Sequence, residues 1–384
     1  MMPGFSRLSI RGFRRLKNVD LHLRPLNVLI GVNGVGKSSI LDAFDLLAAS
    51  ASGNLATTMS DLGGMNSLLT RDGKTTSLHL QLRTHADATP NLAYDIRLTR
   101  QGYGYVISEE VLEPYGAPSG SATGRYIDSR GAIVEYRHDG TVSTPDWDYK
   151  HLETSLSQTP KMYRETEGFR RSVEDISEIY HGLDVSQNGP VRQPQVVSSV
   201  STPGVDGANL VSCLYTIRET ARDRFEAIED AIHAAFPTFE RLDFPPLSAG
   251  RITLAWHEHG FTEPFFPNEL SEGTLRFLWL VTLLQSPGLR EITLIDEPEV
   301  SLHPEMLRLI TELMREASAR TQLIVATHSD RFVRFLEPSE LMVCDKDDDG
   351  GMNAEWADKL DLKDWLEDYT LDQLWSQGVI GGRS

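Results

Sequence analysis

The stretch most able to do chemistry runs from residue 31 to residue 38 and reads Gly-Val-Asn-Gly-Val-Gly-Lys-Ser. Backbone N–H groups in such a loop converge on a phosphate, and the positive end of a following helix adds to the attraction. Lys37 is expected to bridge β- and γ-phosphate oxygens, and the Ser38 hydroxyl to ligate Mg²⁺. The residues predicted to hold the phosphates are Asn33, Gly34, Val35, Gly36, Lys37, Ser38 and Ser39.

Two adjacent carboxylates end an apolar stretch later in the chain. Residues 291–295 predict a strand, and Asp296 and Glu297 follow it. Asp296 is expected to hold Mg²⁺ through water, and Glu297 to orient or deprotonate a water that attacks the γ-phosphate. Taken alone, this pair would be an ordinary acidic strand end, but together with a phosphate loop it predicts a catalytic pair.

Two more motifs place polar groups where an anion could meet them. Ser271 and Gly273 precede an apolar helix expected over residues 275–284, and a helix N-terminus attracts anions. Ser271 can also act as an ordinary N-cap, which is compatible with this role. His328 ends a predicted strand over residues 323–326, and its ring can donate to a phosphate oxygen. A lone histidine there would be structural, and the order of the motifs favours a functional one.

In this order the motifs resemble those of the ABC-type ATPase superfamily. The resemblance implies ATP and Mg²⁺ as ligands, with Lys37, Glu297 and His328 as catalytic residues. It also implies that Ser271 and Gly273 contact ATP held by a second subunit, so that the active form is a homodimer or a higher homo-oligomer. Residues 298–304, Pro-Glu-Val-Ser-Leu-His-Pro, resemble the D-loop of this group.

Within the superfamily, residues 8–16 resemble the start of the RecF, OLD and SMC-related soluble ATPases. The signature Leu-Ser-Glu-Gly-Thr departs from that of transporter ATPases, and no long coiled coil is predicted. Too little chain follows His328 for a TOPRIM nuclease domain, so we expect that the chain does not cut DNA itself. The stretch 369–378 resembles the compact ATPases of bacterial anti-phage and abortive-infection operons, which implies a separately encoded effector, either TOPRIM-like or another nuclease or toxin.

Composition narrows the setting. The 384 residues carry a formal net charge of -18, and no apolar run is long enough to cross a membrane. Two cysteines and no apolar leader favour a reducing, cytoplasmic location without a membrane. The acidic balance argues against a free-standing nucleic-acid binder. Nucleic acid stays possible because of one basic patch, which could equally be a strand-and-turn face near the nucleotide: Arg7, Arg11, Arg14, Arg15 and Lys17.

Periodicity predicts an α/β fold with a mixed sheet, a largely parallel core sheet and an inserted helical, loop-rich lobe. The resemblance implies that this fold is of the P-loop NTPase, ABC-head type. Residues 113–205 have weak periodicity and predict long loops. The residue of the Q-loop is not assigned, since neither Gln81 nor Gln101 has a recognisable context. The expected division is a head over 1–112, the lobe over 113–250, the rest of the head over 251–350 and a tail over 351–384.

Three functions remain in competition at this stage. The first is a defence ATPase that controls a toxic effector. The second is a RecF-like DNA repair or recombination ATPase, which predicts DNA binding that weakens steeply with salt. The third is a nucleotide-gated scaffold that binds ATP without turnover.

Overall fold

The first 30 residues supply strands to two different sheets. β1 (Phe5–Phe13) and β2 (Leu16–His22) alternate buried and exposed side chains, whereas β3 (Leu26–Ile30) is buried along its whole length. Alternation suits a sheet with one solvent face, and a continuous apolar run suits a strand covered on both faces. The computed structural model describes residues 4–381 apart from 86–89, 116–123, 348, 361, 363–364 and 366–368.

The first sheet has eight strands and is antiparallel between all neighbours. In spatial order its strands are β2, β1, β4 (Ser77–Thr84), β5 (Leu92–Gln101), β6 (Gly104–Pro114), β7 (Ile127–Arg130), β8 (Ile133–His138) and β9 (Thr141–Ser143).

The second sheet has six strands and is parallel except at one edge, where β18 pairs antiparallel with β17. In spatial order its strands are β10 (Ile176–Tyr180), β15 (Ile292–Asp296), β16 (Gln322–Thr327), β3, β17 (Leu341–Lys346) and β18 (Met352–Trp356). The largely parallel core sheet with its helices confirms the predicted α/β fold class, and the other sheet, predicted as mixed, is antiparallel throughout.

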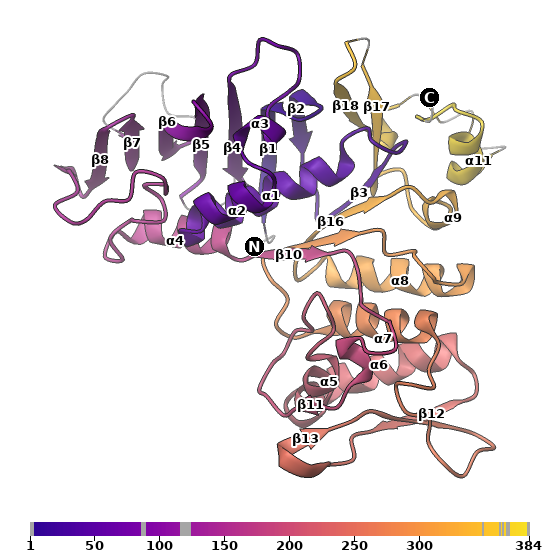
Figure 1. Cartoon of the computed structure of the whole chain (residues 1–384). Helices are drawn as coiled ribbons and strands as arrows, with labels where there is room; N and C mark the ends of the chain where they lie inside the picture. Colours follow the sequence, from indigo (N-terminus) through magenta and orange to yellow (C-terminus); the bar gives the residue numbers. More distant parts are fainter. Residues whose placement is uncertain are drawn as a thin grey trace.

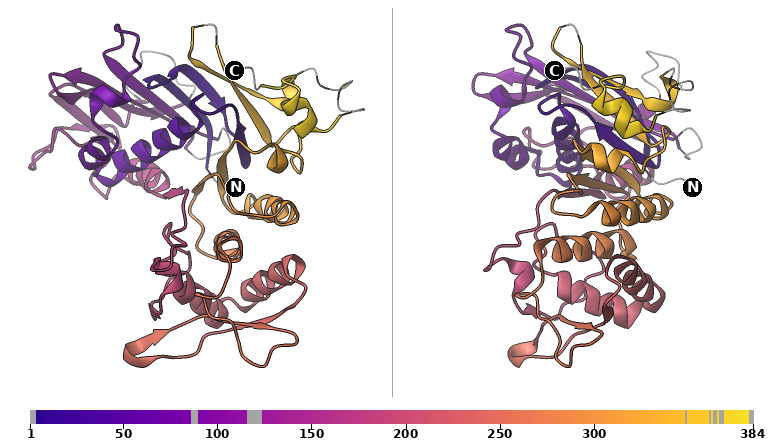
Figure 2. Two further views of the ribbon diagram at one scale, coloured as in Figure 1. Left: turned by 45° about the vertical axis from the view of Figure 1, so that its right-hand side comes forward. Right: turned by 90° about the vertical axis from the view of Figure 1, so that its right-hand side faces the viewer.

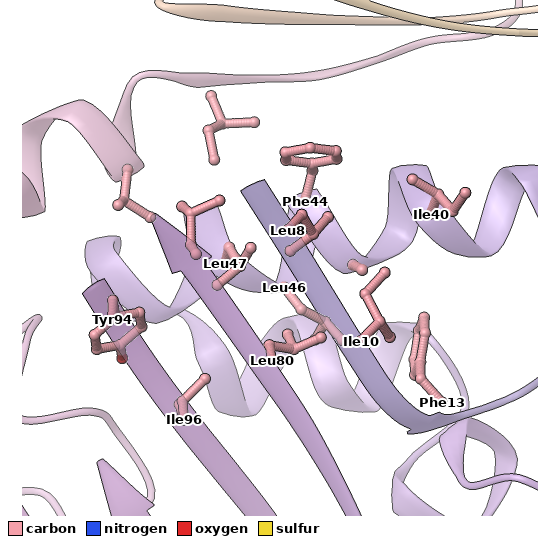
Figure 3. Close-up of a cluster of buried hydrophobic side chains, with 14 of the residues drawn as sticks. Leu8, Ile10, Phe13, Ile40, Phe44, Leu46, Leu47, Leu80, Tyr94 and Ile96 are labelled. Atoms are coloured by element: carbon pink, nitrogen blue, oxygen red, sulfur yellow. The ribbon is translucent and has the colours of Figure 1, made fainter. Parts of the chain in front are cut away.

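The helix that follows β3 joins the two sheets. α1 (Lys37–Ser52) directs Ile40, Phe44 and Leu47 at the inner face of the antiparallel sheet, where they meet β1, β4 and β5 (Figure 3). All three side chains are fully buried, so this face fixes the orientation of the helix. α4 (Arg164–Glu174) packs beside α1, and two short helices, α2 (Leu55–Asp61) and α3 (Met65–Leu68), follow α1.

A lobe hangs from the parallel sheet, below the two sheets in every view (Figure 1, Figure 2). It is built on a second apolar cluster in which α7 packs against α8 on one side and α6 on the other. Its elements and the adjoining helices are β11 (Gln195–Val196), α5 (Leu210–Thr220), α6 (Arg222–Ala235), β12 (Phe239–Asp243), β13 (Arg251–Ile252), β14 (Ala255–Glu258), α7 (Glu272–Gln285) and α8 (Pro304–Ala317). Two further helices, α9 (Asp330–Val333) and α11 (Leu371–Ser376), pack against each other near β17 (Figure 1).

Two regions differ from the sequence-based expectation. Part of the segment 113–205, predicted as long loops, forms β7 to β9, α4 and β10. These short strands are stabilised by pairing, β7 to β9 with their neighbours along the chain and β10 with the distant β15. The sequence over residues 252–256 predicts one strand, whereas in the structure the stretch is divided: β13 pairs with β11, and β14 pairs with β12. Among the described residues no helix is long and apolar enough to cross a membrane. Part of the predicted tail lies outside the described residues.

Candidate active site

The parallel strands β3, β16 and β15 end side by side at one edge of the core sheet. Ile30 of β3 pairs with Thr327 of β16, and Ala326 pairs with Asp296 of β15. The residues that follow these strands therefore meet along this edge, which is where α/β sheets bind ligands. They are Gly31 after β3, His328 after β16 and Glu297 after β15.

The phosphate loop connects β3 to α1 through backbone conformations that favour glycine. Gly34 and Gly36 have φ of 74° and 130°, in the region where side chains other than glycine are strained. A Cβ at Gly31 would lie 2.4 Å from the carbonyl oxygen of Cys344, so glycine also allows close packing on β17. Val35 is fully buried and Ser39 nearly so, while Asn33, Gly34 and Ser38 face outward. The loop is therefore anchored from below and open on its outer side.

Lys37 is held by the loop itself. Its Nζ donates to the carbonyl oxygen of Gly31 at 2.6 Å and to that of Val32 at 3.4 Å. Burial lowers the pKa of Lys37, and the nearby Cys344 and Asp296 counteract this effect. A phosphate bound in the loop would offer this ammonium group a charged acceptor in place of two neutral carbonyls.

Ser38 and Asp296 lie next to each other although 258 residues separate them. The Ser38 hydroxyl donates to Asp296 Oδ2 at 3.4 Å. Burial raises the pKa of Asp296, and the neighbouring Glu297 raises it further. A hydroxyl and a carboxylate are hard oxygen ligands of the kind that Mg²⁺ prefers, so these two neighbouring groups would suit the binding of one such cation.

Glu297 and His328 form the next contact along the edge. His328 Nδ1 lies 3.0 Å from Glu297 Oε1, and the two side chains are 45% and 46% exposed. Glu297 has a left-handed backbone with φ of 51°, so the chain turns sharply after Asp296, and the Glu297 amide still donates to the carbonyl oxygen of Ala326. Both groups stand at an open face of the site, where a second molecule can reach them.

The signature residues contact the D-loop of their own chain. The Ser271 hydroxyl accepts from the Thr274 amide and so caps α7. Ser301, with φ of 62°, donates from its hydroxyl to Glu272 Oε1 at 2.7 Å. A Cβ at Gly273 would lie 2.6 Å from the carbonyl oxygen of Ser301, so this position requires glycine. Within the described chain, the hydrogen bonds of Ser271 link it to Thr274 and not to the phosphate loop.

Sequence reasoning missed His181, which follows β10. Tyr180 of β10 pairs with Ile295, so His181 stands beside Asp296 at the same edge, and its charge lowers the pKa of Asp296. The region around it offered no periodic signal. Of the two glutamines considered, Gln81 donates to Asp95 within the antiparallel sheet, and Gln101 ends β5.

A cleft of about 690 Å³ beside the phosphate loop was missed as well. It lies where the turn between β1 and β2 passes over the loop, since a Cβ at Gly36 would be 3.0 Å from Leu16 and 3.8 Å from Arg15. The hydroxyl of Thr70 is buried in this cleft without a hydrogen-bond partner among the described residues. Its cationic lining residues are Arg14, Arg15, Lys17 and Arg71.

The basic patch predicted from the sequence could serve nucleic acid or be a strand-and-turn face near the nucleotide, and the position of the cleft bears on this choice. Arg7 pairs with Asp20, and Arg14 pairs with Asp42 on α1. The patch is thus divided between a strand face with internal ion pairs and a turn that lines the cleft next to the nucleotide loop. Thr70 could not have been singled out from the sequence, because only the fold shows that its hydroxyl lacks a partner.

Known proteins share this sequence pattern and this fold. An OLD nuclease of Thermus scotoductus is 23% identical over 389 residues, which span 98% of this chain and 67% of the nuclease. RecF proteins of Acinetobacter baumannii, described as DNA replication and repair proteins, are 54% identical over 48 residues, 12% of this chain and 13% of theirs.

Solved structures give the same fold at low identity. An SMC head bound to the C-terminal winged-helix domain of ScpA has a TM-score of 0.58 and 14% identity, covering 92% of this chain and 98% of that one. The head of the Pyrococcus furiosus Smc protein has a TM-score of 0.53 and 13% identity, covering 95% and 99%. These structures support the fold alone.

A family model matches residues 26–334, from β3 to α9, and so includes the phosphate loop, the carboxylate pair and His328. The match covers most of the chain. The fold, the order of the motifs and these relatives agree on an ABC-type ATPase of the RecF, OLD and SMC group. The chain belongs to the AAA-domain family described as "putative AbiEii toxin, Type IV TA system".

Proposed function

We propose that this chain binds ATP with Mg²⁺ and hydrolyses it at a site that two copies complete together. The observation that supports this most directly is the edge of the core sheet. There the Ser38 hydroxyl donates to Asp296, Glu297 contacts His328, and Lys37 lies close enough for the charges of Asp296 and Glu297 to counteract the lowering of its pKa by burial.

The chemistry follows from what each group can hold. Lys37 binds the β- and γ-phosphates, and Ser38 and Asp296 hold Mg²⁺, which neutralises charge on the phosphate oxygens when bound. Glu297 accepts a proton from the water that attacks the γ-phosphorus, while the bond to the β–γ bridging oxygen breaks and ADP leaves. His328 donates to a γ-phosphate oxygen.

The cleft next to the loop suits the nucleoside end of ATP. It lies where the turn between β1 and β2 approaches Gly36 of the phosphate loop. Arg15 and Arg71 line the same cleft and can meet the α-phosphate.

The open face of the site supports a shared active site. Glu297 and His328 are nearly half exposed in the single chain, and a γ-phosphate between them would face solvent. Ser271 and Gly273, at the N-terminus of α7, supply the kind of dipole and amide groups that close such a face when they come from a second copy. ATP then controls the association of two chains.

Turnover against protein concentration tests the proposal. We expect the ATPase rate per chain to rise with concentration and to require Mg²⁺. Glu297→Gln should bind ATP, hydrolyse it at least about a hundredfold more slowly and accumulate as a dimer in light scattering. Lys37→Ala serves as the control that loses binding. A Glu297→Gln variant that turns over ATP like the parent would show that Glu297 is not the catalytic carboxylate.

In the cell, we propose that this ATPase cycle controls a separately encoded effector in anti-phage defence. The family description as a putative toxin and the similarity to an OLD nuclease support this role. Phage plating on cells that carry the chain with its neighbouring gene tests it, with Lys37→Ala as the inactive control. ATP-dependent DNA binding with a steep salt dependence and no effect on plating would favour a RecF-like role instead.

A further inference from the structure

One carboxylate beside the site has an oxygen without a partner. Glu299 lies in the D-loop, and its side chain is only 8% exposed. Its Oε1 accepts from the Thr327 hydroxyl at 2.7 Å and from the His328 amide at 3.4 Å. Its Oε2 is buried and has no hydrogen-bond partner among the described residues. Buried polar atoms are nearly always paired, so an unpaired one calls for an explanation.

The ring of His328 faces two carboxylates through one nitrogen. Nδ1 lies 3.0 Å from Glu297 Oε1 and 3.9 Å from Glu299 Oε1. A contact with carboxylate oxygens makes Nδ1 the donor. The shorter contact is with Glu297, which therefore uses an oxygen that the proposed reaction needs for the attacking water.

We propose that Glu299 is the positioning residue for His328, and that its buried carboxylate takes over the Nδ1–H contact when ATP enters. The move frees Glu297 Oε1 for the water and leaves the other ring nitrogen, Nε2, for a γ-phosphate oxygen. Glu299 is suited to this task because Thr327 fixes its carboxylate on one side while Oε2 is unpaired. The inference rests on the proposed ATPase function and concerns a residue that function does not use.

Glu299→Gln tests the proposal, because the amide keeps the shape of the side chain and removes its charge. We expect the dissociation constant of ATP to stay within about twofold of the parent and kcat to fall about tenfold or more. The double variant Glu299→Gln/His328→Ala should be no slower than His328→Ala, since Glu299 acts only through the ring. Glu312→Gln, an exposed position on α8, is the control that should leave both constants unchanged.

The state of the histidine ring provides a second readout that does not need turnover. In ¹⁵N NMR spectra, the His328 ring of the parent should change its environment when a non-hydrolysable ATP analogue and Mg²⁺ bind, and in Glu299→Gln this change should be lost. Equal kcat values, additive losses in the double variant, or identical ring spectra would each overturn the proposal. A parent that binds the analogue but shows no turnover would refute hydrolysis and leave the ring spectra to decide on Glu299.

Discussion

Asp296 shows how a residue can be costly for the fold and necessary for the site. Burial raises its pKa, and the nearby charge of Glu297 raises it further. A carboxyl whose pKa is higher in the folded than in the unfolded chain keeps its proton longer when folded. The free energy of unfolding therefore falls as the pH rises from the unfolded value of about 3.9 through the folded one. At neutral pH the ionised group opposes folding until a cation binds.

Asp296→Asn should therefore stabilise the nucleotide-free protein. We expect its melting temperature at pH 7 to rise by about 2 °C, since one kcal/mol changes it by roughly that amount in a large chain. The further rise that ATP and Mg²⁺ give the parent should be lost. Thermal denaturation with and without ligand measures both effects.

Asp72→Asn provides the opposite control. Hydrogen bonds from Thr75 and Lys74 lower the pKa of Asp72 to about 2. A lowered pKa stabilises the fold above the unfolded value, and this contribution is lost as the pH falls towards 2. The Asn variant should thus melt lower than the parent at pH 7. A lower melting temperature for Asp296→Asn as well would contradict the argument.

At the scale of elements, the contact between α7 and the D-loop requires a glycine at position 273. Gly273→Ala would place a Cβ 2.6 Å from the carbonyl oxygen of Ser301, which is backbone and cannot move aside freely. We expect a loss of about 1–3 kcal/mol from overpacking, and slower ATP turnover because the D-loop shifts. Denaturant unfolding and an ATPase assay measure the two effects.

Gly168→Ala is the matched control on α4. A Cβ there would meet no atom within 4 Å, and alanine stabilises the interior of a helix by about 0.5–1 kcal/mol relative to glycine. The same substitution should therefore stabilise at one position and destabilise at the other. Equal effects at Gly168 and Gly273 would show that the contact with Ser301 has no energetic weight.

Elements with a strong local signal could be predicted from the sequence. The sequence predicts a helix over residues 304–317, because Pro304 suits a first helical turn and an apolar stripe follows it, and α8 has these bounds. The short apolar run between Pro25 and Gly31 predicts a strand over residues 26–30, which are the bounds of β3. β10 was missed because its partner, β15, lies more than a hundred residues away and its own residues do not alternate.

The same limit applies to the site. The groups proposed to bind phosphate can be found from the motifs, because the loop, strand and helix around each motif are local features of the sequence. The buried state of Glu299 depends on Thr327, the unpartnered hydroxyl of Thr70 on the turn over the loop, and the place of His181 on β10. Such features arise from contacts between distant segments, and one sequence contains no signal for them.

At the scale of the whole molecule, the D-loop connects two functional ends of one chain. Glu297 directly precedes it and Glu299 lies in its first part, and both side chains face His328. Its middle carries Ser301, which is hydrogen-bonded to Glu272 beside the signature glycine. If two copies share their sites, Glu297 and Glu299 act where a chain holds its own ATP, and Glu272 lies beside the signature residues that close the ATP site of the partner. The D-loop therefore connects these two sites within one chain. The two sites are then coupled through covalently continuous segments.

Cooperativity in ATP hydrolysis tests this coupling. We expect the parent to show a Hill coefficient above 1, and both Glu272→Ala and Ser301→Ala to bring it close to 1, because each removes the same hydrogen bond. Glu312→Gln should leave the coefficient unchanged. Steady-state rates over a range of ATP concentrations provide the measurement, and an unchanged coefficient in both alanine variants would rule out the bond as the link.

The hydrogen bond between Ser301 and Glu272 would affect how the two ATP sites of a dimer influence each other. If two chains share their sites, a change at the site where one chain holds ATP is passed through this bond to the site that the same chain closes on its partner. Because both chains do this in the same way, the states in which both sites are open or both are closed are favoured over the mixed state. A pair of these molecules would then behave as a two-position switch, with ATP setting the position and hydrolysis resetting it.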